Sequence, residues 1–298
     1  MATAQIAAQV ETPSGKGAGD ENFPVGSWLL PRALRPHVAI FYAFARAIDD
    51  IADNPGLAPA DKIRRLDGFA AAILGQSPGD LAYIKAHRMR ASLIETGISP
   101  QHCLDLIAAF KRDATTLRYQ SWDELIYGFC MLSAAPVGRY LLDLHGDTPD
   151  GYPASDALCN ALQVINHLQD CKEDYRRLNR VYLPLEWLSE AAETVAALDQ
   201  PRASPGLRRV LDRCLAGVER LLEDARRLPR RLRSRRLAYE TGAIVALAER
   251  LTAMLRRRDP VAERVALAKP GFLLVAAHGV LRTLVLGGGK GSAAAPAE

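Results

Sequence analysis

Apolar residues recur at steps of three and four along most of the chain, which is the spacing of one face of an α-helix. Strict alternation of β-branched and polar residues, the pattern of a strand, is rare, and helix-forming Ala, Leu, Arg and Glu dominate. Prolines divide the pattern into about ten segments of ordinary helix length. The clearest repeats are Leu104, Ile107, Ala108 and Leu158, Leu162, Ile165. The pattern predicts an all-α protein.

The 298 residues are enough for one large domain with a full hydrophobic core. Residues 1–19 are rich in Ala, Gly, Ser and Thr and are predicted to form a disordered N-terminal arm. Residues 287–298 (GGGKGSAAAPAE) are predicted to form a flexible tail. No repeat or low-complexity linker separates them, so residues 20–286 are expected to fold as one domain.

The composition narrows the class of protein. Hydrophobic residues make up 49% of the chain and charged residues 24%, as in soluble globular proteins. Five cysteines without close pairs fit neither a disulfide framework nor a zinc knuckle. The N-terminus lacks the basic and apolar regions of a secretory signal, so we expect a cytoplasmic protein.

The positive charge is concentrated in residues 226–236 (RRLPRRLRSRR), which hold seven arginines. No aromatic residues alternate with them and no nucleic-acid motif accompanies them, so nucleic acid is not expected as a partner. One interpretation is a solvated helix face around Pro229. The other is peripheral contact with the inner face of a membrane, through this charge and the apolar residues 271–286.

Two acidic stretches stand out, residues 46–53 (RAIDDIAD) and residues 166–174 (NHLQDCKED). Residues four apart on a helix lie about 40° apart around the axis and about 6 Å apart along it. The residues that share a face in this way are Asp49 and Asp53 in the first stretch, and Asn166, Asp170 and Asp174 in the second.

Both acidic faces have apolar neighbours, and carboxylates on the inward face of an apolar helix are costly without a counter-charge. Mg²⁺ prefers oxygen ligands and usually shares them with water and substrate phosphate oxygens. Two such faces across a cavity would clamp a diphosphate and make it a leaving group. The alternative is that each cluster forms ordinary salt bridges at the surface.

Residues 41–53 (FYAFARAIDDIAD) and 166–184 (NHLQDCKEDYRRLNRVYLP) resemble the two signature regions of the squalene/phytoene synthase family. These are head-to-head prenyl transferases with the class I isoprenoid synthase fold, a single all-α bundle around a central cavity. The resemblance implies that about three Mg²⁺ ions bind the substrate diphosphate. The implied metal ligands are Asp49, Asp53, Asn166, Asp170 and Asp174, and the four aspartates are the implied catalytic residues.

The resemblance also implies substrate-binding residues. Arg46, one turn before Asp49, would contact diphosphate through its planar donor fork. Arg180 and Tyr182 resemble the family's R-x-Y closing segment, and Tyr42 resembles an aromatic residue that lines the pocket. Read without the family, Tyr42, Arg180 and Tyr182 are as readily assigned to ordinary packing.

The chain departs from the family pattern at three places. Asn22-Phe23 stands where the family usually has Ser-Phe, and Gln169 where many members have Arg. Phe129 replaces a tyrosine whose hydroxyl takes part in the family's condensation half-reaction, although Tyr119 or Tyr127 offers another hydroxyl nearby. These departures together resemble one bacterial branch of the family, the hydroxysqualene synthases of hopanoid biosynthesis.

Resemblance to that branch implies a carbon–oxygen lyase acting on presqualene diphosphate. The enzyme would ionise this substrate and capture the rearranged cation with water, and it would need no NADPH. Other enzymes of the squalene pathway are the partners this implies. The candidates for orienting the water or holding the substrate are Tyr127, Ser133, Gln163, Asn166, Phe129 and Gln169. Candidate cavity walls are Phe69, Phe110, Phe129, Met131 and Leu132.

Two alternatives stay open. The protein is a full head-to-head prenyltransferase that makes presqualene diphosphate, squalene or phytoene from prenyl diphosphates such as farnesyl diphosphate. Or it is a non-catalytic all-α assembly factor, although such relatives typically lose the aspartates that this chain keeps.

Overall fold

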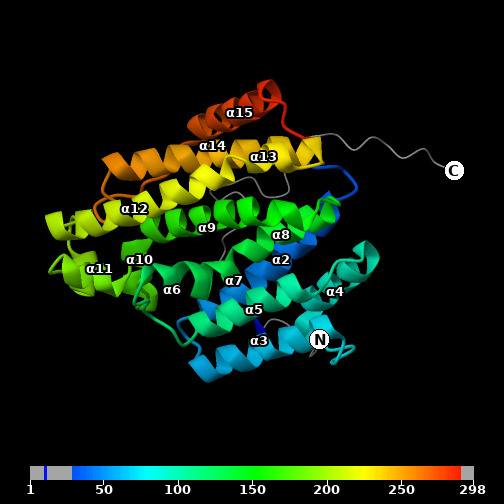
Figure 1. Cartoon of the computed structure of the whole chain (residues 1–298). Helices are drawn as coiled ribbons and strands as arrows, with labels where there is room; N and C mark the ends of the chain where they lie inside the picture. The colour runs from blue at the N-terminus through cyan, green and yellow to red at the C-terminus, as the bar shows by residue number, and fades with distance from the viewer. Residues whose placement is uncertain (1–9, 12–28, 290–298) are drawn as a thin grey trace.

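The computed structural model of the chain describes residues 10–11 and 29–289, and every regular element in these ranges is a helix (Figure 1). The all-α prediction is therefore confirmed. Most of the predicted arm, the pair Asn22-Phe23 and residues 290–298 lie outside the described residues.

The longer helices carry the architecture. They are α2 (Arg35–Ala52), α3 (Pro59–Leu74), α4 (Ile84–Thr96), α5 (Gln101–Asp113), α8 (Ala135–Leu144), α9 (Tyr152–Gln169), α10 (Cys171–Leu178), α12 (Pro205–Ala225), α14 (Arg235–Arg257) and α15 (Lys269–Val285). The short elements between them are η1 (Leu81–Tyr83), α6 (Trp122–Leu125), η2 (Ile126–Cys130), α7 (Met131–Ser133), η3 (Pro149–Gly151), α11 (Leu185–Glu190), η4 (Val195–Asp199) and α13 (Leu228–Arg231).

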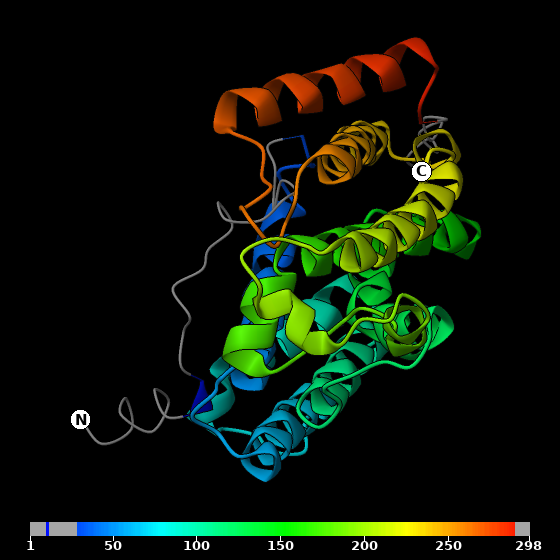
Figure 2. The same ribbon diagram turned by 90° about the vertical axis from the view of Figure 1, so that its left-hand side faces the viewer.

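The helices stack from α3 at one edge of the molecule to α15 at the other (Figures 1 and 2). Helix α9 lies in the middle, packed against α8, α12 and α14, while α2 packs against α3, α4 and α5. Most side chains of α9 are buried, which is expected of a helix surrounded by others. The bundle thus places α2 and α9, which carry the two acidic stretches, in its interior.

The prolines open helices more often than they end them. Pro59 and Pro205 are the first residues of α3 and α12, and Pro36, Pro153 and Pro270 lie in the first turns of α2, α9 and α15. The first turn tolerates proline because its amide groups have no partner within the helix.

Residues Glu124–Leu144 form the one described helical segment that is long and apolar enough, by length and composition alone, to cross a membrane. The segment runs through α6, η2, α7 and α8, and 61% of its most apolar window is buried inside the structure. Such burial is typical of a core helix. The segment includes a π-helical turn, η2, which places Phe129 and Cys130 in the core.

Candidate functional site

A cavity of about 250 Å³ lies between α2, α8, α9 and α14. Its walls are largely apolar and include Phe41, Phe110, Leu158 and Ile244. The polar residues on its lining are Tyr42, Arg46, Asp49, Ser133, Ser155, Gln163, Asn166, Glu240 and Thr241. The cavity therefore offers a long apolar space with the first acidic stretch and the end of α9 on its wall.

On the α2 side, the arginine and the acids of the first stretch are paired within the helix. Arg46 donates to Asp49 Oδ2 at 2.6 Å and to Asp50 Oδ1 at 3.0 Å. Burial, and then the nearby charge of Asp53, raise the pKa of Asp49 well above its ordinary value, although Arg46 opposes the shift. The neutral form of the Asp49 carboxyl is thus favoured by its buried position even with Arg46 beside it.

The second acidic stretch lies at a bend between two helices. Helix α9 ends at Gln169 and α10 begins at Cys171, with Asp170 between them at φ −101°. The amides of Asp170 and Asp174 still donate four residues back, to Asn166 and Asp170. The prediction that these three residues share a face therefore holds through the bend.

The two acidic stretches approach each other across the site. Burial raises the pKa of Asp174 to about 8, and the charges of Asp170 and then Asp53 add to the effect. Asp53 follows α2 directly and Asp174 belongs to α10, so this electrostatic coupling joins the two stretches. This coupling places Asp53 and Asp174 near one another, and the joint binding of metal by the two carboxylate faces stays a prediction.

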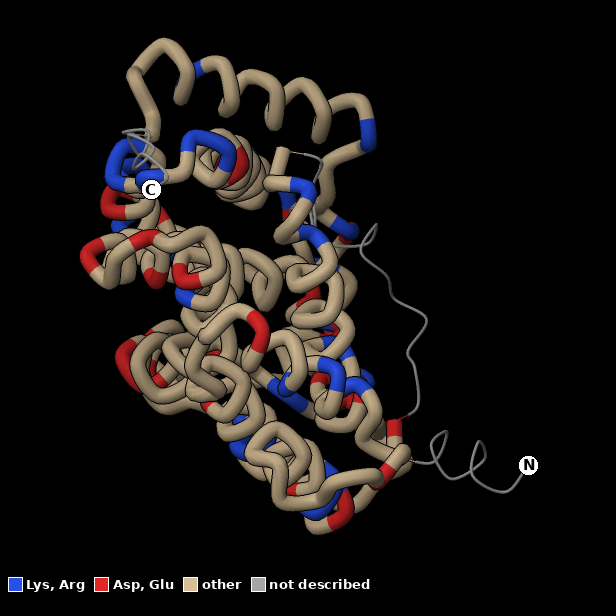
Figure 3. The backbone as a smooth tube through the Cα atoms, turned by 90° about the vertical axis from the view of Figure 1, so that its right-hand side faces the viewer, with Lys and Arg blue, Asp and Glu red and all other residues tan. Residues whose placement is uncertain are grey.

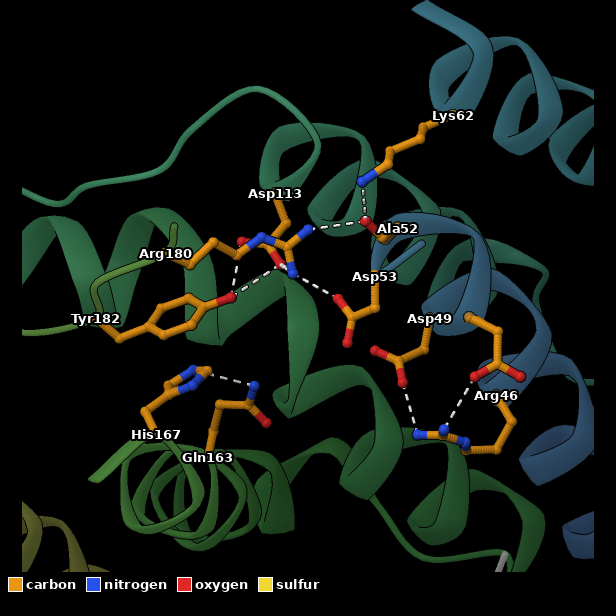
Figure 4. A network of polar contacts seen from close by, with 11 residues as sticks. Arg46, Asp49, Ala52, Asp53, Lys62, Asp113, Gln163, His167, Arg180 and Tyr182 are labelled. Atoms are coloured by element: carbon orange, nitrogen blue, oxygen red, sulfur yellow. Dashed lines mark hydrogen bonds and ion pairs between the residues drawn. The ribbon is translucent and has the colours of Figure 1, made fainter. Parts of the chain in front are cut away.

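Arg180 connects several segments next to the acidic residues (Figure 4). Its guanidinium lies 2.5 Å from Asp53 Oδ1 and 2.8 Å from Asp113 Oδ2, and it donates to the carbonyl of Ala52 at 2.9 Å. Tyr182 donates its hydroxyl to the same Asp113 carboxylate. Arg180 thereby links the ends of α2 and α5 to the loop that follows α10.

Backbone pairing holds that loop in place. Val181 forms an isolated parallel bridge with Arg118, and its amide donates to Leu117 at 3.0 Å. Asn179, just before it, takes a left-handed conformation (φ 52°) that closes α10. These contacts direct the side chains of Arg180 and Tyr182 inward.

An aromatic cluster lies under the polar network. The ring of Tyr182 stacks on the ring of His167, with 3.6 Å between the ring centroids. The ring centroids of Tyr119 and Phe129 lie 5.8 and 5.5 Å from that of Tyr182. Burial, with a smaller contribution from Arg180, lowers the pKa of His167 to about 3, so its ring is neutral. Its Nε2 atom accepts from Gln163 Nε2 at 3.2 Å, which directs the Gln163 amide away from full exposure to the cavity.

The site fits magnesium only if substrate oxygens complete the coordination. Among the described residues, no three His, Cys, Asp or Glu side chains converge as a ready-made metal site. The acidic residues of the two stretches offer carboxylates, which are hard oxygen ligands, and burial with neighbouring carboxylates raises the pKa values of Asp49 and Asp174. Mg²⁺ commonly binds through one or two carboxylates together with substrate phosphates and waters. The donor chemistry therefore suits Mg²⁺ held between two carboxylate faces and a diphosphate.

Several predicted site residues lie elsewhere. The prediction for Tyr127 was wrong, because its side chain is 70% exposed while Ile126, Phe129 and Cys130 occupy the inner face of the same turn. Gln169 is buried, but its amide donates to the carbonyl of Val265 at 2.5 Å instead of lining the cavity.

The predicted cavity walls are also corrected in part. Phe110 lines the cavity, as expected. Phe69 packs in the core against Phe44 and Tyr83, and Phe129 lies in the aromatic cluster behind the cavity. Met131 and Leu132 are half-buried and do not line it.

Sequence reasoning overlooked Asp113, Glu240 and Lys62. Burial raises the pKa of Asp113 to about 6 despite the Arg180 contact. A sequence signal existed, because Asp113 follows Leu106 and Ala109 on the buried face of α5. Glu240 is a buried acid on the cavity lining, and Lys62 donates to Ala52 O at 2.6 Å.

Comparisons with known proteins show which family the chain belongs to. The squalene/phytoene synthase family profile matches residues 17–270. The chain is 43% identical to the hydroxysqualene synthase of Rhodopseudomonas palustris, over 96% of this chain and 97% of that protein. It is 41% identical to the hydroxysqualene synthase of Sinorhizobium fredii, over 88% and 87%.

Among solved structures, the chain is similar to the squalene synthase HpnC from Alicyclobacillus acidocaldarius, with 29% identity and a TM-score of 0.70. The match covers 86% of this chain and 94% of that one. The all-α isoprenoid synthase fold that the two acidic motifs implied is thus confirmed. The sequence profile, the full-length relatives and the paired acidic faces lead to one conclusion: the chain belongs to the squalene/phytoene synthase family.

Proposed function

We propose that this member of the family is a hydroxysqualene synthase, a carbon–oxygen lyase that converts presqualene diphosphate and water into hydroxysqualene and diphosphate. Relatives with that name are 43% and 41% identical over most of the chain. The family uses prenyl diphosphates, a chemistry that generally goes with a divalent metal. The choice of presqualene diphosphate, and of about three Mg²⁺ ions, is our proposal.

The observation that carries the proposal is that the acidic stretch on α2 lies on the wall of a largely apolar cavity. A substrate with a long hydrocarbon body fits walls such as Phe41, Leu158 and Ile244. Its diphosphate belongs at the acidic end, beside Arg46 and Asp49. Bound Mg²⁺ would neutralise the charge that develops on the leaving diphosphate.

Each polar residue then has a part. Asp49 and Asp53 on one side, and Asn166, Asp170 and Asp174 on the other, would hold the metal ions. Arg46 would donate directly to diphosphate oxygens. As the C–O bond breaks, its electron pair leaves with diphosphate and the cation remains in the apolar part of the cavity, where bulk water is excluded.

Ser133 is the best placed residue to orient the water that ends the reaction. Its hydroxyl is buried, lines the cavity and has no hydrogen-bond partner within the described part of the chain. A buried hydroxyl without a partner is costly, and a water molecule would satisfy it. The water oxygen would form the new C–O bond and lose its proton to solvent or to the departing diphosphate.

The test is a product assay with purified protein, Mg²⁺ and ¹⁸O-labelled water, without NADPH. Presqualene diphosphate and farnesyl diphosphate are supplied in separate tubes. We expect a C30 alcohol carrying ¹⁸O from presqualene diphosphate and no product from farnesyl diphosphate. A C30 hydrocarbon formed by loss of a proton from the cation, or unlabelled alcohol, would contradict water capture.

Consumption of farnesyl diphosphate would instead favour a head-to-head prenyltransferase. Tyr119 is the residue that makes this alternative worth testing, because its hydroxyl is buried without a described partner, beside Phe129. In that case Tyr119→Phe should abolish the condensation. If neither substrate reacts, and Mg²⁺ with diphosphate leaves the melting temperature unchanged, the protein is a non-catalytic member of the family.

A further inference from the structure

Helix α15 packs on α14 through small residues. A Cβ atom at Gly279 would lie 2.4 Å from the carbonyl oxygen of Gly242, and one at Gly242 would meet Thr283. The two helices therefore approach as closely as their backbones allow. Gly279 and Thr283 are the buried residues of α15, so its inner face contributes little apolar surface to the core.

The large apolar side chains of α15 point outward. The most exposed are Leu273 (67%), Leu274 (72%), Leu281 (60%), Leu284 (57%) and Val285 (75%). They recur at steps of seven and eleven and so form one continuous stripe, here called the α15 stripe. A surface helix of a water-soluble protein normally turns such a stripe toward the core. Here the stripe is exposed, on a helix that lies at the edge of the molecule (Figure 2).

A basic pocket of about 360 Å³ adjoins the C-terminal end of this stripe. It is lined by α13, α14 and α15, including Leu286 at the end of α15. Figure 3 shows α15 largely without charge, with basic segments gathered in the chain near its C-terminal end. The arginines of the pocket are Arg226, Arg227, Arg230, Arg231 and Arg282.

The positive charge of this arginine pocket is only partly neutralised. Glu249 pairs with both Arg226, at 2.5 Å, and Arg282, at 3.2 Å. Arg230 and Arg231 are exposed and have no ion-pair partner among residues 29–289. The pocket thus offers free guanidinium groups, which bind phosphate oxygens well.

We propose that the α15 stripe and the arginine pocket dock the protein onto an anionic lipid bilayer, with a lipid phosphate in the pocket. An interfacial helix combines large apolar side chains, which enter the acyl region, with basic groups that meet anionic headgroups. Both features are present side by side. A second copy of the chain docked on the stripe alone would not account for the exposed guanidinium groups of Arg230 and Arg231, which are unpaired within the described part of the chain.

The docking surface lies on the other side of the cavity wall. Leu228 and Leu237 line the cavity, whereas Pro229 and Arg230 in the same segment line the arginine pocket. Helix α14 likewise presents Thr241 to the cavity and Gly242 to the pocket. Docking would therefore bring the apolar end of the cavity next to the lipid. Anionic lipids on the cytoplasmic leaflet make that leaflet the expected partner.

The experiment is flotation of the full chain with vesicles of phosphatidylcholine alone or mixed with phosphatidylglycerol. Wild-type protein should float with the mixed vesicles, and less as salt is raised. Arg230→Glu with Arg231→Glu should weaken partitioning about 30-fold. The matched control reverses two exposed arginines at the opposite edge, Arg64→Glu with Arg88→Glu, and should leave flotation unchanged.

A second pair of variants tests the apolar stripe. Leu274→Ser with Val285→Ser should weaken partitioning about tenfold, because shallow insertion depends on buried apolar area. Leu81→Ser with Ile94→Ser, which changes exposed apolar residues elsewhere, is the control. Circular dichroism melts establish that each variant is folded, so that a loss of flotation reports binding.

Three outcomes would overturn the proposal. Wild-type protein that floats equally with and without phosphatidylglycerol would remove the role of the arginines. Equal losses in the test and control pairs would remove the role of this surface. Sedimentation velocity that shows a dimer broken by Leu274→Ser with Val285→Ser, without vesicle binding, would assign the stripe to a second copy.

Discussion

The two arginines nearest the acidic residues have opposite surroundings. The side chain of Arg180 is 4% exposed and joins Asp53 and Asp113 from two other segments of the chain. Arg46 is 19% exposed, lines the cavity and forms its ion pairs with Asp49 and Asp50 on its own helix. Arg180 thus belongs to the tertiary structure, whereas Arg46 lies on the cavity wall beside the acids of its own helix.

This difference indicates that the charged groups around Arg180 and those around Asp49 and Asp174 have different roles. Around Arg180, positive charge is matched to carboxylates in a buried network. Around Asp49 and Asp174, burial and then neighbouring carboxylates raise the pKa values well above the ordinary range, further than for Asp113, whose pKa rises only to about 6 beside Arg180. The first region should govern folding, and the second should govern turnover.

The largest effect is expected from Arg180→Met. This change leaves Asp113 buried without its ion-pair partner, and breaking a buried pair from one side costs about 3–5 kcal/mol. Arg46→Met should cost less, about 1–2 kcal/mol, because its ion pairs lie within one helix and Arg46 itself is partly exposed, although Asp50 is buried. Urea unfolding of both variants measures the contrast. Equal losses of unfolding free energy would remove the distinction between the two regions.

Asp49→Asn should have the next largest effect, on catalysis. We expect turnover of presqualene diphosphate to fall about 100- to 1000-fold, because the variant loses a carboxylate that stabilises the leaving group through metal. The unfolding free energy should change by about 1 kcal/mol or less, since the substitution also relieves repulsion from Asp53. Asp150→Asn, at an exposed position, is the control. Normal turnover in Asp49→Asn would refute the clamp.

A smaller effect is expected from pH on ligand-linked stability. The raised pKa values of Asp49 and Asp174 mean that the folded, metal-free protein holds protons which the unfolded chain releases above about pH 4. The contribution of Asp174 to stability is therefore present at low pH and is lost as the pH rises through about 8, and that of Asp49 is lost in the same direction. Bound cations reverse this by favouring the charged carboxylates.

Mg²⁺ with diphosphate should accordingly stabilise the protein more at about pH 8.5 than at about pH 6, by about 1–3 kcal/mol. Melting curves at both pH values, with and without these ligands, give the comparison. Asp174→Asn should reduce the pH dependence. A ligand effect that is the same at both pH values would indicate that these carboxyl groups do not bind the cation.

The smallest effect is expected from Tyr127→Phe. Because this side chain is 70% exposed, both turnover and stability should stay within about 0.5 kcal/mol of wild type. Ser133→Ala is the informative partner, since it removes a buried hydroxyl from the cavity lining. Kinetic assays and product ratios should change in Ser133→Ala alone. A loss of activity in Tyr127→Phe would indicate that the Tyr127 hydroxyl takes part in the reaction despite its exposed position.

Much of the site was predictable because it depends on local spacing. The shared face of Asp49 and Asp53, and of Asn166, Asp170 and Asp174, follows from four-residue steps and survives the bend between α9 and α10. The all-α class follows from the same periodicity. The coupling of Asp53 with Asp174 depends on how α2 packs in the bundle, which the spacing within each stretch does not determine.

What could not be predicted depends on contacts between distant segments. Asp113 meets Arg180 across 67 positions, and no local pattern joins them. Tyr127 and Phe129 lie two residues apart, yet the packing of a π-helical turn places one outside and the other in the core. Gln169 was expected to face the substrate, but the chain between α14 and α15 supplies Val265 as its partner.

The wall that α13 and α14 share between the cavity and the arginine pocket bears on how the product leaves. Releasing a hydrocarbon into water costs about 0.8 kcal/mol for each methylene group that becomes hydrated, so a long product would dissociate slowly. When the protein is docked on a bilayer, the apolar end of the cavity is next to the acyl chains. The product then moves from one apolar environment, the cavity, into another, the bilayer, without being hydrated. Turnover would then depend on the lipid present, and detergent or vesicles should accelerate the steady state without changing the first turnover.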